Sequence, residues 1–319
     1  MGAAEQRDGV DLTNLDQPLT AEAGATKRDL VDYLDGVADR MLPGLAGRPL
    51  TVLRALRGRA PFMQKNAPKY TPDWVRTTTI WADASHREVR YPLCDDRRTL
   101  LWLANQRAIE YHPALGLADD VYRATHLVLD LDPPADAGFD AVVAVAHLVH
   151  RALADSGLAG AVKTSGAKGI HVFVPIDGTS PPDDVAAATR ALAVRTEALD
   201  PALATTKYVL DERDGKVFVD STRSGGNTVA AAYTPRLRPG LPVSFPVDWA
   251  DLDDVDPAAM TVHTALDALA GKDPWRESMP GPQRLPDDLI DQGRTIPVAR
   301  VAAMHEGKRR ARARREQSG

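Results

Sequence analysis

An apolar segment that ends in two closely spaced acids is the feature that most restricts how this chain folds. Residues 125–136, THLVLDLDPPAD, carry aliphatic side chains up to Asp130 and Asp132, and two prolines follow. A short apolar run followed by two prolines predicts a strand over 125–131. Because side chains alternate along a strand, Val128 and both acids would share one face. The acid pair would hold metal, work as an acid/base pair, or mark where the strand leaves the core.

The rest of the chain alternates between helical and strand-like patterns. Helices are predicted at 27–42, 99–113, 139–156 and 184–200, with a short one near 261–270. A strand, a glycine-rich turn and a second strand are predicted within each of 161–176 and 215–236. Strands separated by helices, together with hairpin-like turns, favour a mixed α/β (α+β) fold.

No composition shift marks a sharp domain boundary. We therefore expect a single domain over 1–300, with a helical flank at 1–60 and the core at 61–300, followed by a basic, disordered tail at 301–319. The chain has 319 residues, of which 44% are hydrophobic and 26% charged, so it can bury a substantial core.

The composition also bears on location and partners. The one cysteine, Cys94, excludes an intrachain disulfide, and neither a signal peptide nor a membrane-spanning segment is predicted, so we expect a cytoplasmic protein. The net charge of −5 gives no global sign of nucleic-acid binding. Basic residues nevertheless gather at 53–65 and 307–319, and the distribution of charge governs such binding more than its sum.

A third acid ends a second predicted strand. The segment 216–220, KVFVD, is apolar until Asp220. Two separate strands that each end in carboxylates are typical of a Mg²⁺ or Mn²⁺ site with oxygen ligands. A turn-forming aspartate ahead of Ser221 and Thr222 is the alternative.

The segment 164–171, TSGAKGIH, carries groups that suit an anion. Ser165 offers a hydroxyl, Lys168 a positive charge, and His171 an imidazole, while the glycines let backbone N–H groups approach closely. The spacing is not that of a Walker A loop. The pattern favours anion binding, and a plain hairpin turn with a solvated lysine is the alternative.

Isolated basic and aromatic residues add weaker signals. Arg223 and Arg236 flank the glycine turn after the third acid, and Arg236 is able to make two parallel hydrogen bonds to a phosphate. His112 stands where the predicted helix ends, a position typical of a helix-end hydrogen bond. Phe62 lies in the basic stretch that ends at Lys65, where it would stack on a base or pack in the core.

Together these motifs resemble the archaeo-eukaryotic primase superfamily and, more narrowly, the polymerase domain of bacterial non-homologous end-joining ligase D. The resemblance is carried by DLDP, TSGAKGIHVFVPI, VFVDSTR and YTPR in this order, with DLTNLDQPL and PFMQKNAPKYTPDWVRT earlier in the chain. It covers about residues 10–300. It implies a primase-polymerase core of mixed β-sheets flanked by helices, here expected as a stand-alone module.

The resemblance implies a role for each candidate residue. The metal-binding and catalytic acids would be Asp130, Asp132 and Asp220, holding two Mn²⁺ or Mg²⁺ ions. The residues around the incoming nucleotide would be Ser165, Lys168, His171, Arg236, Arg223 and His112. The DNA contacts would be Asn14 and Lys27 at a 5′-phosphate across a gap, Phe62 at the template, and Lys65.

The implied function is templated nucleotidyl transfer that releases pyrophosphate and favours ribonucleotides, filling short gaps or extending primers in DNA repair. The expected partners are gapped or primer-template DNA with a 5′-phosphate, NTPs and dNTPs, and a separate ATP-dependent DNA ligase. The protein would be a monomer associated with the bacterial nucleoid and not with membranes. Two positions differ from the pattern of the resembled family. Gln17 stands where that family has a second phosphate-binding lysine, and Met63 stands where it has a second aromatic residue. We therefore expect gap filling at least as much as break joining.

Two alternatives stay open. LVLDLDP also resembles the first motif of haloacid-dehalogenase-type phosphatases, although Pro133 and Pro134 stand where that family has Gly-Thr. The other alternative is a non-catalytic module that binds DNA ends or gaps and derives from the polymerase fold. The presence of all three acids argues against it, because carboxylates without metal would repel DNA phosphates.

Overall fold

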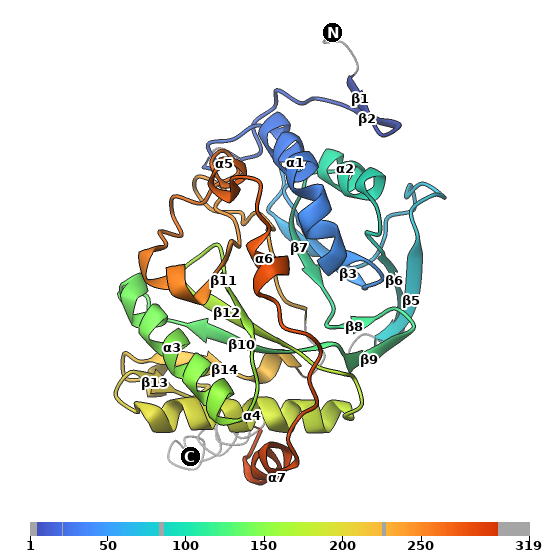
Figure 1. Ribbon diagram of the computed structural model, residues 1–319. Helices are drawn as coiled ribbons and strands as arrows, with labels where there is room; N and C mark the ends of the chain where they lie inside the picture. The colour runs from blue at the N-terminus through green and yellow to red at the C-terminus, as the bar shows by residue number, and fades with distance from the viewer. Residues whose placement is uncertain (1–4, 21, 83–85, 225–227, 299–319) are drawn as a thin grey trace, which may run out of the picture. The chain divides into compact units, whose positions relative to one another are not determined.

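The computed structural model describes residues 5–20, 22–82, 86–224 and 228–298, which form two compact units. Unit 1 is built from the described parts of 1–124, 161–168 and 226–279, and unit 2 from those of 125–160, 169–225 and 280–319 (Figure 1). Both units combine helices with strands, so the predicted α/β class is confirmed. The single domain over 1–300 stays a prediction, and the tail at 301–319 lies outside the described residues.

The central strand of unit 2 is β10, His126–Asp132. It pairs antiparallel with β12 (Ile170–Pro175) on one side and with β14 (Val217–Asp220) on the other. The two-residue β13 (Ala204–Thr205) lies parallel to β14. The apolar residues of β10 from 127 to 129 are fully buried, as a strand between two neighbours requires. The strand predicted at 125–131 is confirmed to within one residue.

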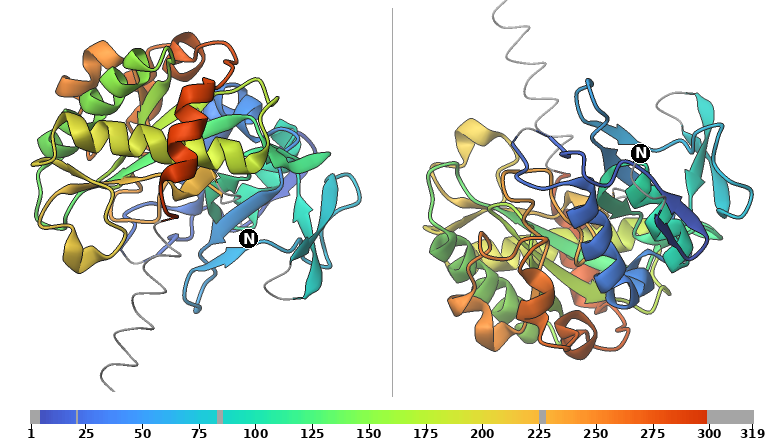
Figure 2. Two further views of the ribbon diagram at one scale, coloured as in Figure 1. Left: turned by 90° about the horizontal axis from the view of Figure 1, so that it is seen from below. Right: turned by 90° about the horizontal axis from the view of Figure 1, so that it is seen from above.

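Three helices accompany these strands. α3 (Phe139–Asp155) and α4 (Pro182–Leu199) pack on β10 and β14, and they confirm the helices predicted at 139–156 and 184–200. Figure 2 shows α7 (Asp287–Thr295) lying across α4. The contact is close because Gly293 has no side chain: a Cβ there would lie 1.9 Å from the carbonyl oxygen of Ala187.

In unit 1, α1 (Lys27–Leu45) and α2 (Arg97–Asn105) lie side by side (Figure 1). α1 begins at a capping box, in which the Thr26 side chain accepts from the Asp29 N–H and the Asp29 side chain accepts from the Thr26 N–H. α1 also contacts the three-stranded antiparallel sheet β4-β3-β7. The strands of this sheet are β3 (Leu50–Arg54), β4 (Phe62–Gln64) and β7 (Ala108–Pro113).

The remaining elements are short. The strand pairs of unit 1 are β1 (Glu5–Arg7) with β2 (Val10–Leu12), β5 (Thr77–Ala82) with β6 (Arg87–Pro92), β8 (Gly116–Leu117) with β9 (Asp120–Ala124), and β11 (Ala161–Thr164) with β15 (Pro246–Val247). Its short helices are η4 (Trp249–Asp254), α5 (Ala265–Leu269) and α6 (Pro274–Ser278), and those of unit 2 are η2 (Leu210–Glu212) and η3 (Thr222–Ser224). No helix in the described parts of the chain is long and apolar enough to cross a membrane.

Two predicted elements are wrong. The helix predicted at 99–113 ends at Asn105, because Arg107 takes a left-handed backbone with φ of 63° and the chain turns into β7. The second strand predicted within 215–236 does not form among residues 228–236, which make only isolated bridges at Thr228 and Pro235. Tyr233 has a φ of 66° there, which strand geometry does not allow.

The contact between α4 and α7 gives the first prediction. Gly293→Ala should lower the free energy of unfolding by about 1–3 kcal/mol, because the added methyl group must push the two helices apart. Gly281→Ala is the matched control, since a Cβ at Gly281 meets nothing within 4 Å. Urea unfolding of both variants measures the difference, and equal stabilities would contradict the close packing.

Candidate active site

Strand register brings two of the three predicted acids together. Asp130 of β10 lies directly opposite Asp220 of β14, and opposite His171 of β12 on its other side. Residues opposite one another in antiparallel strands point to the same face of a sheet. A row of Asp220, Asp130 and His171 therefore crosses one face of unit 2.

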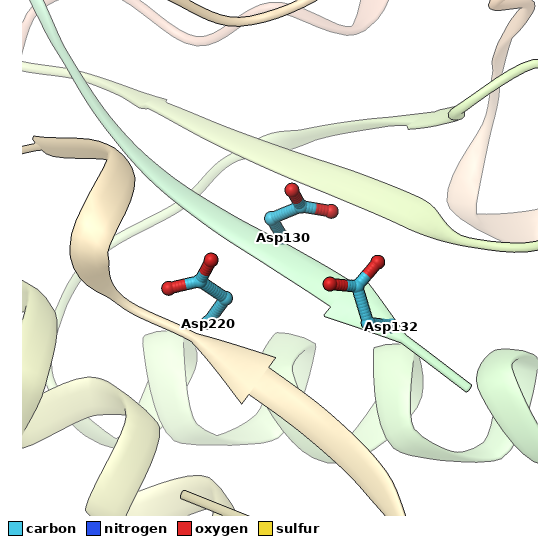
Figure 3. Close-up of side chains that lie close together, drawn as sticks. All are labelled: Asp130, Asp132 and Asp220. Carbon is cyan, nitrogen blue, oxygen red and sulfur yellow. The ribbon is translucent and has the colours of Figure 1, made fainter. Parts of the chain in front are cut away.

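Asp132 completes a cluster of three carboxylates. It lies two residues beyond Asp130 on the same strand, so its side chain is on the same face. One carboxylate oxygen from each of Asp130, Asp132 and Asp220 lies within 4.8 Å of the others (Figure 3). Asp130 and Asp220 are buried and Asp132 is partly exposed, so the cluster opens at Asp132.

The cluster holds more negative charge than its protein neighbours offset. Burial by itself raises the pKa of Asp130, but His171, with Nε2 at 3.2 Å, and Arg223, with Nη2 at 2.9 Å, hold it well below its usual range. Arg223 Nε also lies 3.5 Å from Asp220. Burial and the carboxylates of Asp130 and Asp220 raise the pKa of Asp132 to about 6. Repulsion between the acids is therefore not removed by Arg223 and His171.

The donor set of this cluster fits a metal ion. Three carboxylates on one face supply the hard oxygen ligands that Mg²⁺ and Mn²⁺ prefer. A bound cation would also offset the burial and the repulsion from Asp130 and Asp220 that together raise the pKa of Asp132. The arrangement is thus capable of metal binding.

A second charged group lies in unit 1, around Glu110 of β7. This buried carboxylate accepts from His112 Nε2 at 2.9 Å and from the backbone N–H of Leu237 at 2.9 Å, and it forms an ion pair with Arg236 Nε at 3.0 Å. Burial raises the pKa of Glu110, but the contacts to His112, Arg236 and Leu237 outweigh it and hold the pKa at about 2. Two of the predicted nucleotide-binding residues, His112 and Arg236, thus meet at one acid.

The predicted anion-binding turn contributes Ser165 to the same group. Arg236 Nη1 donates to the carbonyl oxygen of Ser165 at 2.6 Å. Gly166 follows with a φ of 67°, and a Cβ there would lie 2.6 Å from Cγ of Arg236, so only glycine lets the turn approach the arginine this closely. Lys168 is exposed at the end of the turn. Ser165 and Lys168 belong to unit 1, whereas His171 belongs to unit 2.

Of the two predicted 5′-phosphate contacts, Lys27 begins α1 and Asn14 lies in the segment between β2 and α1. Lys27 is buried, and its Nζ donates to the carbonyl oxygen of Thr13 at 2.5 Å and to Oδ1 of Asn105 at 2.6 Å. Burial and the nearby Arg107 lower the pKa of Lys27 to about 8. Asn14 follows Thr13, is exposed, and has a left-handed φ of 54°. Lys27 therefore lies next to the backbone that leads into Asn14, and the contact of both residues with a 5′-phosphate stays a prediction.

The predicted template contacts lie on a separate element of unit 1. Phe62 begins β4, the edge strand of the three-stranded sheet, and its side chain is exposed. Lys65 follows this strand and is exposed as well. The core-packing alternative for Phe62 is therefore wrong, while its contact with a template stays a prediction.

Two residues that organise these groups were missed from the sequence. Glu110 shares a strand face with His112, a signal hidden by the incorrect helix at 99–113. Asn105, at the end of α2, accepts from the Thr13 N–H and from Lys27 and donates to the Asp11 carbonyl. No local pattern marks Asn105, because its partners are about 80–95 residues away in sequence.

Comparison with known proteins shows similarity to one family. A family model described as "LigD, primase-polymerase domain" matches residues 26–275. The multifunctional non-homologous end joining DNA repair protein LigD of Mycobacterium tuberculosis is 38% identical over 266 residues, which cover 79% of this chain and 34% of that protein. The bifunctional non-homologous end joining protein LigD of Bacillus subtilis is 31% identical over 265 residues, covering 82% of this chain and 42% of that protein.

A solved structure is similar as well. The polymerase domain of Mycobacterium tuberculosis ligase D, in complex with DNA, has a TM-score of 0.77 and 35% sequence identity, covering 86% of this chain and 98% of that chain. The chain therefore spans nearly a whole polymerase domain, but only 34% to 42% of the length of the two curated bacterial relatives.

The raised pKa of Asp132 gives a prediction about stability. Its pKa of about 6 in the folded chain lies above the unfolded value of about 3.9, so ionisation costs stability as the pH rises through 6. In a metal chelator at pH 8, Asp132→Asn should therefore be more stable than the wild type by about 1–3 kcal/mol, and the difference should shrink towards pH 4.

Urea unfolding across this pH range measures the effect. Adding Mn²⁺ at pH 8 should stabilise the wild type more than the variant, since the variant has lost a carboxylate ligand. A difference that does not change with pH would show that the acids do not repel one another.

Proposed function

The chain belongs to the LigD primase-polymerase domain family, whose membership implies a nucleotidyltransferase, and from this we propose that it is a DNA-dependent polymerase of DNA repair. In this proposal it fills short gaps or extends primers by nucleotidyl transfer with release of pyrophosphate. It uses NTPs and dNTPs and favours ribonucleotides. The observation that carries the proposal is the cluster of three carboxylates on two adjacent strands. Its negative charge is not fully offset by the neighbouring cations.

Asp130, Asp132 and Asp220 would hold two divalent ions, Mn²⁺ or Mg²⁺. Bound ions of this kind lower the pKa of an attacking hydroxyl and offset the charge of a triphosphate. Arg223 and His171 keep Asp130 ionised, so this carboxylate is ready to bind a cation across the neutral pH range. Arg223 would also face the negative charge that builds up on the nucleotide during transfer.

The group in unit 1 carries an excess of positive charge, which suits a phosphate group. Arg236 and Lys168 are cations, and the Ser165 hydroxyl and the His112 ring supply further hydrogen-bonding groups. Glu110 offsets only part of this charge. We therefore assign Ser165, Lys168, His112 and Arg236 to the incoming nucleotide, together with His171 and Arg223 of unit 2.

DNA contacts are assigned to a separate set of residues. Asn14 and Lys27 would bind the 5′-phosphate across a gap, Phe62 would stack on a template base, and Lys65 would contact the backbone. The tail at 301–319 would add salt-sensitive affinity for any DNA sequence. A separate ATP-dependent DNA ligase would then seal the filled gap in the bacterial cytoplasm. The phosphatase alternative gains nothing from the family match.

Primer extension tests this function. On a gapped duplex with Mn²⁺, the wild type should add nucleotides and release pyrophosphate, and Asp130→Ala should lower the rate about a thousandfold or more. Asp288→Asn is the matched control, because it removes a surface ion pair, 3.0 Å from Arg195, without touching the cluster. The non-catalytic alternative would hold instead if the wild type bound gaps without extending primers.

The lowered pKa of Lys27 predicts how the preference for gaps that carry a 5′-phosphate changes with pH. The charge of Lys27 is lost as the pH rises through about 8, although a bound phosphate would raise this value. The ratio of affinities for gaps with and without a 5′-phosphate should therefore fall between pH 7 and pH 9.5. Lys27→Gln should have a low ratio throughout. A ratio that is high and constant in the wild type would remove Lys27 from this role.

A further inference from the structure

Glu110 is a buried acid that contacts two of the unit 1 residues that we assign to the nucleotide, His112 and Arg236. Its side chain is 7% exposed and lies on β7, two residues before His112 and on the same strand face. Oε2 accepts from His112 Nε2 at 2.9 Å and pairs with Arg236 Nε at 3.0 Å, while Oε1 accepts from the Leu237 N–H at 2.9 Å. Both oxygens are therefore engaged.

These contacts decide which nitrogen of His112 carries hydrogen. An ionised carboxylate only accepts hydrogen bonds, so Nε2 of His112 must be the donor to Glu110. The other ring nitrogen, Nδ1, then points away from Glu110, and the ring plane is fixed by a bond to a buried partner. With glutamine in place of Glu110, the amide group has donors of its own, so Nε2 no longer needs to carry hydrogen.

One hydrogen bond and one ion pair hold the guanidinium group of Arg236, and its Nε makes the ion pair without forming a hydrogen bond to the protein. Nε faces Glu110 at 3.0 Å, and Nη1 donates to the Ser165 carbonyl at 2.6 Å. Nη2 takes part in neither contact. The planar guanidinium therefore has a set orientation, and the edge bearing Nη2 keeps hydrogens for a ligand. The bond from the Leu237 N–H ties the backbone that follows Arg236 to the same carboxylate.

From this geometry we propose that Glu110 is a positioning residue for the nucleotide, which it serves by orienting His112 and Arg236. The proposal rests on the proposed function, because it matters only if those two side chains contact the nucleotide. Glu110 itself would face the same charge as a phosphate, so it acts through its two partners and not by direct contact.

Glu110→Gln tests the proposal, since it keeps the shape of the side chain and removes its charge. The KM for the nucleotide in primer extension, and its dissociation constant, should rise about 10–100-fold, with kcat changed less than about threefold. Glu110→Asp keeps the charge on a shorter side chain and should recover part of the affinity. Asp288→Asn, which removes the exposed pair with Arg195, should change neither constant.

A double-mutant cycle separates positioning from a general loss of stability. If Glu110 acts through Arg236, then Glu110→Gln should weaken nucleotide binding much less when Arg236 is already alanine. The ¹⁵N NMR shifts of His112 give a second measurement that needs no nucleotide. They should report hydrogen on Nε2 in the wild type and a mixture of both ring forms in Glu110→Gln, in variants whose urea midpoints show that they are folded.

The results distinguish failure of this proposal from failure of the function. Unchanged nucleotide affinity in Glu110→Gln, beside a wild type that extends primers, would overturn the positioning role alone. Equal losses in the wild-type and Arg236→Ala backgrounds would overturn it as well. A wild type that neither binds nucleotides nor extends primers would overturn the proposed function, and the His112 spectra would still test the contact with Glu110.

Discussion

Repulsion between three carboxylates on one sheet face is the constraint on which the rest of unit 2 depends. The register that sets Asp130 opposite Asp220 keeps these two acids next to one another as long as β10 and β14 stay paired. Arg223 and His171 offset part of the charge and keep Asp130 ionised, yet the pKa of Asp132 is still raised to about 6. The folded chain therefore holds a site whose electrostatic energy is improved by a bound cation or by protonation of Asp132.

The two charged groups have an excess of opposite charge: the group in unit 2 is negative and the group in unit 1 is positive. In unit 2, the three acids of the cluster outnumber the cations that contact them. In unit 1, the carboxylate of Glu110 lies among Arg236, His112 and the turn that carries Lys168. The first suits metal ions and the second suits phosphate. In the proposed function the substrate is a triphosphate used with divalent ions, so each imbalance suits one part of that substrate.

Much of this was predictable from local patterns. The strand over 125–131, the helices at 139–156 and 184–200 and the acids at the strand ends depend on spacing within a few residues. The error at 99–113 shows the limit of such patterns. The segment 108–113, AIEYHP, continues the helical periodicity of α2. It forms a strand nevertheless, because it pairs with β3 and because the backbone takes a left-handed turn at Arg107.

The sequence by itself determined which residue types stand at strand ends and turns, and so indicated metal and phosphate chemistry. Only the tertiary structure decided that Asp220 lies opposite Asp130, that Glu110 holds both His112 and Arg236, and that Asn105 binds Lys27. The physical reason is that periodicity is a local property of the backbone. Register, burial and the pKa values that follow from them depend on strands and side chains that are distant in sequence.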